Sequence, residues 1–185
     1  MEWVVKPRKW YDEAVGSEAP GRPRLTAKGE RTRARIVEAA AGLIYKRGVA
    51  GTSLDDIRSA AGVSGSQLSH YFAGKDELVQ SVIGYQAATI TGNQRQADLS
   101  SPDGLRAWRD MVIAQVKSSQ GHGGCPLGSL AGQLAETDPR ARAQIAAGFE
   151  QWSAAISEGM QRLQAAGDLP ASIDADDYAI TLLAV

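Results

Sequence analysis

The stretch Thr52–Leu78, which reads TSLDDIRSAAGVSGSQLSHYFAGKDEL, decides the fold. Its pattern predicts two short helices, Leu54–Ala61 and Gly65–Tyr71, with only Gly62-Val63-Ser64 between them. Three residues leave room for a tight turn and nothing else. Glycine at the first of these positions suits the left-handed backbone that such a turn requires. The two helices are therefore expected to pack at a steep angle, with Val63 filling the angle between them.

Longer helices are expected on both sides of this pair. Apolar residues at three- and four-residue spacings predict a helix from about Ala27, which Gly48 ends. A second long helix is expected to start at Lys75 and to run to about Thr91. Ser53 and Ser64 are N-cap candidates for the two short helices, because a serine hydroxyl can accept a hydrogen bond from a free N–H of the first turn.

The rest of the chain also has helical periodicity, and no strand pattern competes with it. Helices are expected after Ser101-Pro102, from Cys125-Pro126 to Leu134, over Pro139–Ala166 and from Asp174 onward. The predicted fold class is all-α: an N-terminal three-helix helix-turn-helix domain followed by a C-terminal helical domain. The expected divisions are a disordered extension (1–21), the helix-turn-helix domain (22–83), and a second helical domain (84–185) that is cut within its last helix.

Charge is distributed unevenly along the chain, although the net charge is only −1. Residues 22–95 carry 11 Lys and Arg against 6 Asp and Glu, whereas residues 96–185 carry 6 against 11. A basic first half suits contact with DNA phosphates, and an acidic second half suits a body that stays away from them.

Composition and motifs exclude several other classes of protein. The apolar stretches are far shorter than the about 20 residues that span a bilayer, and a single cysteine cannot build a disulfide framework. A cytoplasmic protein without membrane contact is therefore expected. His70 and His122 are the only histidines, so no metal site is expected. No cofactor is expected either, and no catalytic motif supports an enzyme.

In a helix-turn-helix the second helix enters the major groove of DNA and the first crosses the backbone. The second helix here exposes small and polar side chains, with Leu68 as its inward anchor. Gln67 could pair with N6 and N7 of adenine, and the serine hydroxyls could serve bases or phosphates. His70 is interpreted either as a phosphate donor or as a ring packed beneath Tyr71.

Thr26–Ile83 resembles the DNA-binding domain of the TetR family. The segments that carry the resemblance are Arg35–Ala40 (RIVEAA), Gly48-Val49, Thr52–Ile57 (TSLDDI), Ala60–Ser64 (AAGVS), His70–Phe72 (HYF) and Lys75–Leu78 (KDEL). Gly124–Ala131 (GCPLGSLA) is similar to a segment in one branch of the same family. Two departures stand out: Ser69 occupies a position where the family usually has tyrosine, and Ser66 one where many members have glycine.

The resemblance implies a ligand-responsive repressor that binds a palindromic double-stranded DNA operator as a homodimer. It places Ser64–Tyr71 on the recognition helix, Thr52 at the start of the backbone-contacting helix, and Lys75 where the family grips a phosphate. Arg24 belongs to a short basic arm, interpreted either as a linker or as an arm that enters the minor groove. The predicted DNA-binding residues are Arg24, Thr52, Ser53, Ser64, Gly65, Ser66, Gln67, Ser69, His70, Tyr71 and Lys75.

The resemblance also implies that residues 84–185 form a C-terminal helical regulatory and dimerisation domain. It places a ligand-binding pocket for the effector among these helices, and dimerisation at the Pro139–Ala166 helix and the helix after it. A scarcity of charge on the apolar stripes favours a small apolar or aromatic effector. An effector-independent DNA-binding protein is the alternative. Each candidate pocket residue could instead be ordinary core. The candidates are Trp108, Met111, Val112, Cys125, Leu127, Leu130, Leu134, Phe149 and Trp152.

Cys125 supports a further alternative, a thiol-based electrophile sensor. It lies at an expected helix start, where free N–H groups and the helix dipole would stabilise a thiolate. The simpler interpretation is a small, half-buried apolar residue at a junction between loop and helix.

Overall fold

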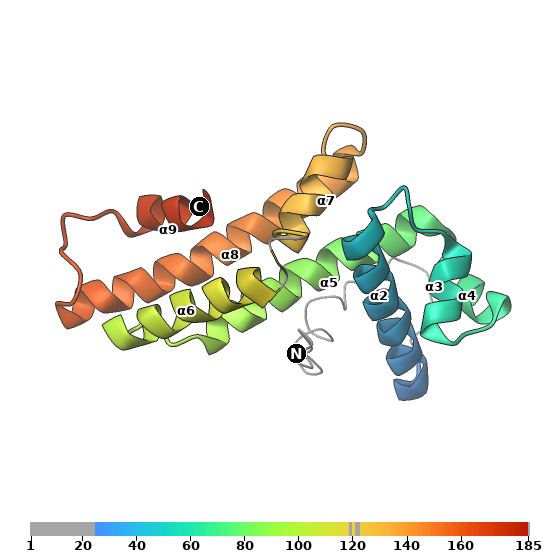
Figure 1. Cartoon of the computed structure of the whole chain (residues 1–185), viewed down its shortest axis with the longest axis horizontal. Coiled ribbons are helices and arrows are strands. Elements are labelled where there is room, and N and C mark those ends of the chain that lie inside the picture. Colours follow the sequence, from blue (N-terminus) through green and yellow to red (C-terminus); the bar gives the residue numbers. More distant parts are fainter. Residues whose placement is uncertain (1–24, 119, 121–122, 185) are drawn as a thin grey trace.

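The computed structural model describes residues 25–118, 120 and 123–184, and this part of the chain contains helices and no strand. In Figure 1 the molecule is elongated, with α2, α3 and α4 at one end and α9 toward the other. The long helices α5 and α8 lie side by side along its length. The helices are α2 (Ala27–Arg47), α3 (Leu54–Ala61), α4 (Gly65–Tyr71), α5 (Lys75–Gln96), α6 (Pro102–Ser118), α7 (Pro126–Leu134), α8 (Pro139–Ala166) and α9 (Ala175–Ala184).

The all-α fold class is confirmed, and most predicted helix bounds agree with the structure. The difference is α5, which continues five residues beyond the expected end at Thr91. Thr91 and Gln94 are buried there, 6% and 4% exposed, and α5 packs against α8. Tertiary packing thus extends the helix past Gly92 and Asn93, whose own helix propensities are weak. The proposed boundary at residues 83 and 84 consequently falls inside a continuous helix.

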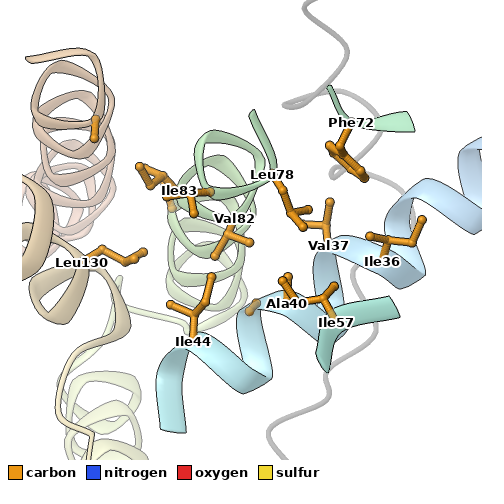
Figure 2. Packing of buried hydrophobic residues seen from close by; sticks show 14 of the residues in the cluster. Ile36, Val37, Ala40, Ile44, Ile57, Phe72, Leu78, Val82, Ile83 and Leu130 are labelled. Atoms are coloured by element: carbon orange, nitrogen blue, oxygen red, sulfur yellow. The ribbon is translucent and has the colours of Figure 1, made fainter. Parts of the chain in front are cut away.

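The first hydrophobic core is formed jointly by the N-terminal helices α2–α5 and by α7 and α8 of the C-terminal part. In Figure 2, Val37 and Ile44 of α2 face Leu78 and Val82 of α5, and Leu130 of α7 lies beside them. Ile145 of α8 belongs to the same buried cluster. We call this cluster the shared core. Because packed interiors resist deformation, a displacement of α7 or α8 acts on α2 and α5 through it.

A second core lies between α8 and α9. Its buried members include Leu99, Ile156, Met160 and Leu163. Gly159 lets the Leu99 side chain approach α8 closely, because a Cβ at that glycine would lie 2.5 Å from the Leu99 Cβ. The segment between α5 and α6 is therefore tightly packed against α8 at this point.

Helix α6 is different, because none of its residues is buried. Met111, Val112, Ile113 and Val116 are 41–55% exposed. Leu105 and Trp108, nearer its start, are half-buried against the second core. The apolar stripe predicted for this helix thus faces solvent along the second half of α6.

Candidate nucleic-acid interface

Helix α4 presents one side to the core and the other to solvent. Leu68 is 6% exposed and belongs to the shared core, as predicted for the inward anchor. Five of the predicted contact residues on α4 itself are exposed: Gly65, Ser66, Gln67, Ser69 and His70. This is the arrangement that a helix requires to enter a major groove while it stays attached to its domain.

The turn before α4 is held by backbone geometry. Gly62 has φ 61° and ψ 43°, the left-handed conformation expected of it. Its N–H donates to the carbonyl of Ser59, and the N–H of Val63 donates to that of Arg58. Val63 is buried. The angle between α3 and α4 is therefore fixed by a glycine, two backbone hydrogen bonds and one buried side chain.

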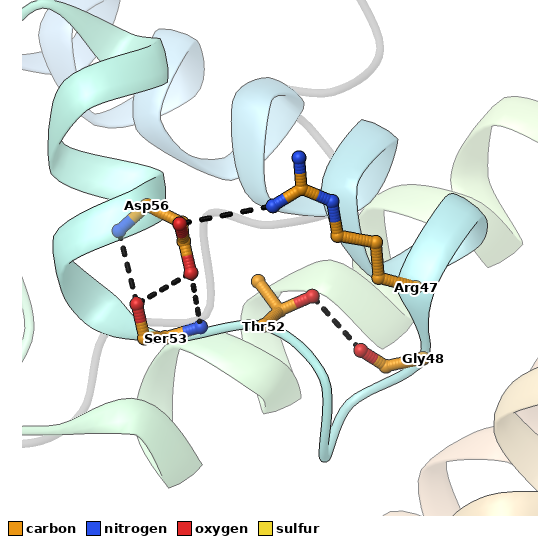
Figure 3. A network of polar contacts seen from close by, with 5 residues as sticks. All are labelled: Arg47, Gly48, Thr52, Ser53 and Asp56. Atoms are coloured by element: carbon orange, nitrogen blue, oxygen red, sulfur yellow. Dashed lines mark hydrogen bonds and ion pairs between the residues drawn. The ribbon is translucent and has the colours of Figure 1, made fainter.

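The start of α3 is a reciprocal capping box, shown in Figure 3. The Asp56 N–H donates to the Ser53 hydroxyl (3.1 Å), and the Ser53 N–H donates back to the Asp56 carboxylate (3.0 Å). Arg47, at the end of α2, lies 3.7 Å from the same carboxylate. Hydrogen bonds from Ser53 lower the pKa of Asp56, and the charge of Arg47 adds to this effect. The network ties α2 to α3.

Thr52 does not offer its side chain to DNA. It is fully buried, and its hydroxyl donates to the carbonyl of Gly48 at 2.8 Å, as Figure 3 shows. Its role here is to fix the turn between α2 and α3. The structure therefore does not support the predicted DNA contact of Thr52, because the hydroxyl is both inaccessible and already bonded.

Helix α4 also begins with a capping box, which the sequence interpretation missed. The Gln67 N–H donates to the Ser64 hydroxyl (3.1 Å), and the Ser64 N–H donates to the Oε1 of Gln67 (2.9 Å). The spacing Ser-x-x-Gln was the available signal. Gln67 was considered only as a base contact, yet half of its amide group is used by its own helix.

Ser69 and His70 differ in how much hydrogen-bonding capacity they present. The Ser69 hydroxyl lies within hydrogen-bonding distance of two carbonyls of its own helix, those of Gly65 (3.1 Å) and Ser66 (3.2 Å). Phosphate oxygens accept hydrogen bonds, so Ser69 is a weak phosphate ligand in this rotamer. His70 is exposed, and its ring meets Tyr71 edge-on at 5.0 Å between centroids. His70 is thus accessible to a phosphate, and its ring also packs against Tyr71.

Lys75 is the first residue of α5, directly after the recognition helix. Gly74, the N-cap residue, provides no side-chain hydrogen bond to this helix end.

Arg33 of α2 connects the end of α4 to α5. Its guanidinium lies 5.2 Å from the centre of the Phe72 ring and donates to the Ser81 hydroxyl at 2.9 Å. The sequence interpretation did not single out Arg33, because nothing local to α2 indicates a partner 48 residues away.

Two parts of the prediction lie outside the described residues, namely Arg24 and the extension 1–21.

Within the described ranges no helix is long and apolar enough to cross a membrane. The same residues contain no group of three or more His, Cys, Asp or Glu side chains that could hold a metal ion.

The predicted effector residues do not gather around one cavity. Met111 and Val112 are exposed on α6, whereas Leu127 and Leu130 are 0% and 2% exposed in the shared core. The other five, Trp108, Cys125, Leu134, Phe149 and Trp152, are half-buried. This arrangement does not support effector contacts by Leu127 and Leu130, which pack as core. A depression of about 380 Å³ lies elsewhere, between α8 and the start of α9, with Gln161, Gln164 and Asp174 among its lining residues.

Three polar contacts connect the C-terminal helices to the headpiece, which we define as α2, α3, α4 and the start of α5. The Val49 N–H donates to Oε1 of Gln133 on α7 at 2.7 Å. The Tyr45 hydroxyl donates to the carbonyl of Gly124 at 3.1 Å. The Gln80 amide donates to Asp138, the N-cap of α8, at 3.0 Å. These contacts run alongside the shared core.

Tyr45 lies against the loop that precedes α7. A Cβ at Gly123 would lie 2.3 Å from the Tyr45 ring, so this close approach requires glycine. Burial raises the pKa of Tyr45, and the nearby Cys125 raises it further. Cys125 is the N-cap of α7, and its Sγ accepts a hydrogen bond from the Gly128 N–H at 3.4 Å.

A compact helix-turn-helix, exposed on one side and joined by a shared core to a helical body, defines the class of helix-turn-helix regulatory proteins. Comparisons with known proteins narrow this class. Residues 36–82 match the profile of the bacterial regulatory proteins of the tetR family, and residues 102–185 match the tetracyclin repressor-like C-terminal domain. The chain belongs to the TetR family, whose members are DNA-binding regulators and not enzymes.

Relatives and solved structures agree with this assignment. The HTH-type transcriptional regulator TtgR of Pseudomonas putida is 45% identical over 60 residues, which cover 32% of this chain and 29% of TtgR. A regulator from the lacX 3' region of Lactococcus lactis is 28% identical over 137 residues, covering 71% of this chain and 69% of that protein. A TetR regulator from Chloroflexus aurantiacus has a TM-score of 0.70 at 27% identity, covering 86% and 82% of the two chains.

Proposed function

We propose that the protein is a transcriptional repressor that binds a palindromic operator as a homodimer and is released by a small molecule. The observation that carries the proposal is the one-sided exposure of α4, with Leu68 in the core and five small or polar residues facing outward. Specific recognition requires a rigid helix whose outer face can contact base edges. Glycine and serine at the start of α4 allow its backbone to approach the groove floor.

Homodimerisation follows from the geometry of operators. Two recognition helices read successive major grooves when they are about 34 Å apart, so the DNA half-sites mirror the two-fold axis of the dimer. We propose that α8 and α9 form the dimer contact. The C-terminal part of α8 and the whole of α9 lie at the end of the molecule away from α4, which leaves both recognition helices of a dimer accessible (Figure 1).

Release by an effector requires a ligand that prefers the conformation in which the two headpieces fit the operator badly. We propose that the effector acts on the half of the body that contains α6, which lacks buried residues and is therefore the helix most easily displaced. The shared core and the Gln133–Val49 hydrogen bond provide the connection from the body to the headpiece.

Buried polar groups refine the chemistry of the effector. The Nε2 of Gln94 and the hydroxyl of Thr91, both on α5, are buried without a hydrogen-bond partner, whereas the Oε1 of Gln94 accepts from the Trp152 indole at 3.1 Å. An unpaired buried donor destabilises the protein until a partner arrives. We therefore propose a largely apolar or aromatic effector that carries at least one hydrogen-bond acceptor.

The proposal is tested by fluorescence anisotropy of the protein with DNA from upstream of its own gene, at two salt concentrations and with random duplex as competitor. Tight binding that survives the competitor supports a specific regulator. A library of small aromatic compounds with and without a carbonyl group is then screened for compounds that release the protein from the operator. Specific binding that no compound weakens would favour an effector-independent regulator, and equal binding to the operator and to random DNA would contradict the proposal.

Lys75 provides the sharpest test of how the headpiece meets the phosphates. Lys75→Ala should weaken binding to operator and random DNA alike, and should reduce the slope of log affinity against log salt by about one. Lys117→Ala, which removes an exposed lysine from α6, is the matched control and should change neither quantity. If Lys75→Ala left the salt slope unchanged, Lys75 would not contact a phosphate.

A thiol-based sensor is the second candidate, because Cys125 caps α7 beside Tyr45. An alkylated Sγ would no longer fit against the Gly128 N–H, and the start of α7 would shift against α2. Treatment with N-ethylmaleimide should then release DNA from the protein but not from Cys125→Ser. Equal sensitivity of both proteins would exclude this candidate.

A further inference from the structure

We propose that Gln67 reads guanine and not adenine at one operator position, because the helix cap uses its carbonyl oxygen and leaves only its NH2 group for DNA. The inference rests on the proposed function and specifies the chemistry of one contact within it. It also reverses the adenine pairing that the residue type alone predicts.

The cap determines which end of the Gln67 amide group faces outward. Oε1 accepts the Ser64 N–H at 2.9 Å, and only an oxygen can accept that hydrogen bond. The Gln67 N–H in turn donates to the Ser64 hydroxyl, which lies 3.0 Å from the Ser66 hydroxyl. Gln67 is exposed, and in the described part of the chain its Nε2 has no hydrogen-bond partner. The end of this amide that is not engaged within the helix is therefore its NH2 group, a pure donor.

A pure donor distinguishes the bases in the major groove. Guanine presents two adjacent acceptors there, N7 and O6, and both can accept from one NH2 group. Adenine presents N7 beside its own N6 amino group, so one donor would face another donor. Cytosine presents only an amino group, and thymine a single acceptor beside a methyl group. The expected preference is guanine first and cytosine last.

Adenine pairing would require the Gln67 amide to turn its oxygen toward the DNA. The Ser64 N–H would then lose its acceptor at the end of a seven-residue helix, in an interface from which DNA displaces water. Unsatisfied groups in such surroundings are costly. Guanine demands no change, since the helix keeps both cap hydrogen bonds while Nε2 donates.

The test begins by locating the contact. A set of operators carries each of the four base pairs at each position, changed symmetrically in both half-sites. Fluorescence anisotropy measures the affinity of the wild type and of Gln67→Ala for every member of the set. The Gln67 contact is the position at which Gln67→Ala binds all four base pairs with equal affinity. At that position the wild type should bind guanine roughly 5- to 150-fold more tightly than adenine. Replacing this guanine by 7-deazaguanine, which lacks N7, should weaken the wild type but not Gln67→Ala.

Gln67→Glu separates the cap from the base contact. A glutamate at this position keeps the reciprocal cap, so α4 should stay as stable as in the wild type, as measured by thermal unfolding. Its free oxygen is an acceptor, which should move the preference from guanine to cytosine. Ser64→Ala is the matched control: it removes the hydroxyl but keeps the N–H that orients Gln67, so its preference for guanine should remain although its affinity falls.

Three results would overturn the inference. They are a wild-type preference for adenine at the Gln67 position, an unchanged base preference in Gln67→Glu, and a lack of any position that Gln67→Ala equalises. Each of these leaves a specific DNA-binding protein in place. If the wild type bound no operator better than random duplex, the proposed function itself would fail and the inference with it.

Discussion

The headpiece and helix α6 differ in how far their apolar side chains are buried. In the headpiece each short helix starts with a capping box, and buried residues such as Ile57 and Leu78 are fully enclosed. Helix α6 has no buried residue, and its apolar residues 111–113 and 116 are exposed. Precise reading of DNA requires the first arrangement, whereas a response to a small molecule requires an element that can move at low free-energy cost. The headpiece is built around the shared core and α6 packs against the second core, and Trp152 of α8 contacts both cores.

The largest contrast should appear when the same residue type is truncated in the two regions. Ile57→Ala removes a fully buried side chain of α3 and should lower the free energy of unfolding by about 2–5 kcal/mol. Ile113→Ala removes one that is 42% exposed on α6 and should change it by no more than about 0.5 kcal/mol. Urea unfolding measures both. Similar losses in the two variants would show that α6 is packed as firmly as the headpiece, which would contradict the difference described above.

Glycine substitutions sharpen the comparison, because they show that not all of the body is loosely packed. Gly159→Ala brings a Cβ to 2.5 Å from that of Leu99 in the second core and should destabilise the protein by about 1–3 kcal/mol. Gly132→Ala is the control: a Cβ there meets nothing within 4 Å, so alanine should stabilise α7 by up to about 1 kcal/mol. A neutral Gly159→Ala in thermal unfolding would mean that the packing of Leu99 against α8 yields easily.

The contact between the headpiece and α7 can be weakened selectively. Gln133→Ala removes the acceptor of the Val49 N–H and should reduce the free energy of unfolding by about 0.5–1.5 kcal/mol. Its more specific effect is local, namely faster hydrogen exchange of the Val49 amide and weaker release of DNA by an effector. Gln115→Ala on α6 is the matched control. Unchanged exchange at Val49 would show that this hydrogen bond does not hold the headpiece to α7.

How much the sequence revealed depended on whether a feature was local. The bounds of α3 and α4 followed from Gly62, Ser53 and Ser64, because caps and turns are set by residues three or four apart. The outward face of α4 followed from Leu68 as the single apolar anchor. These short-range rules were sufficient to recognise the family and to place the recognition helix.

Features that depend on distant contacts were missed or misjudged. The burial of Thr52, the extension of α5 to Gln96 and the pairing of Gln133 with Val49 all require knowledge of what packs alongside. The sequence also could not tell the predicted effector residues apart, since Leu127 and Met111 look alike in a helical stripe, yet one is core and the other faces solvent. Apolar periodicity shows that a face is apolar, and it does not show what covers that face.

The smallest expected effect concerns how the α3 cap responds to acid. Ser53 lowers the pKa of Asp56 below its ordinary value of 3.8, so the charged carboxylate stabilises the folded state above that pH. This contribution is lost as the pH falls through the lowered pKa, because the carboxylate must then take up a proton. The stability difference between wild type and Asp56→Asn, measured by urea unfolding, should therefore shrink as the pH falls from neutral to below 3.8. Ser53→Ala removes the hydrogen bonds that lower this pKa and should reduce the same pH dependence. A difference that stayed constant with pH would show that the carboxylate charge contributes nothing to the link between α2 and α3.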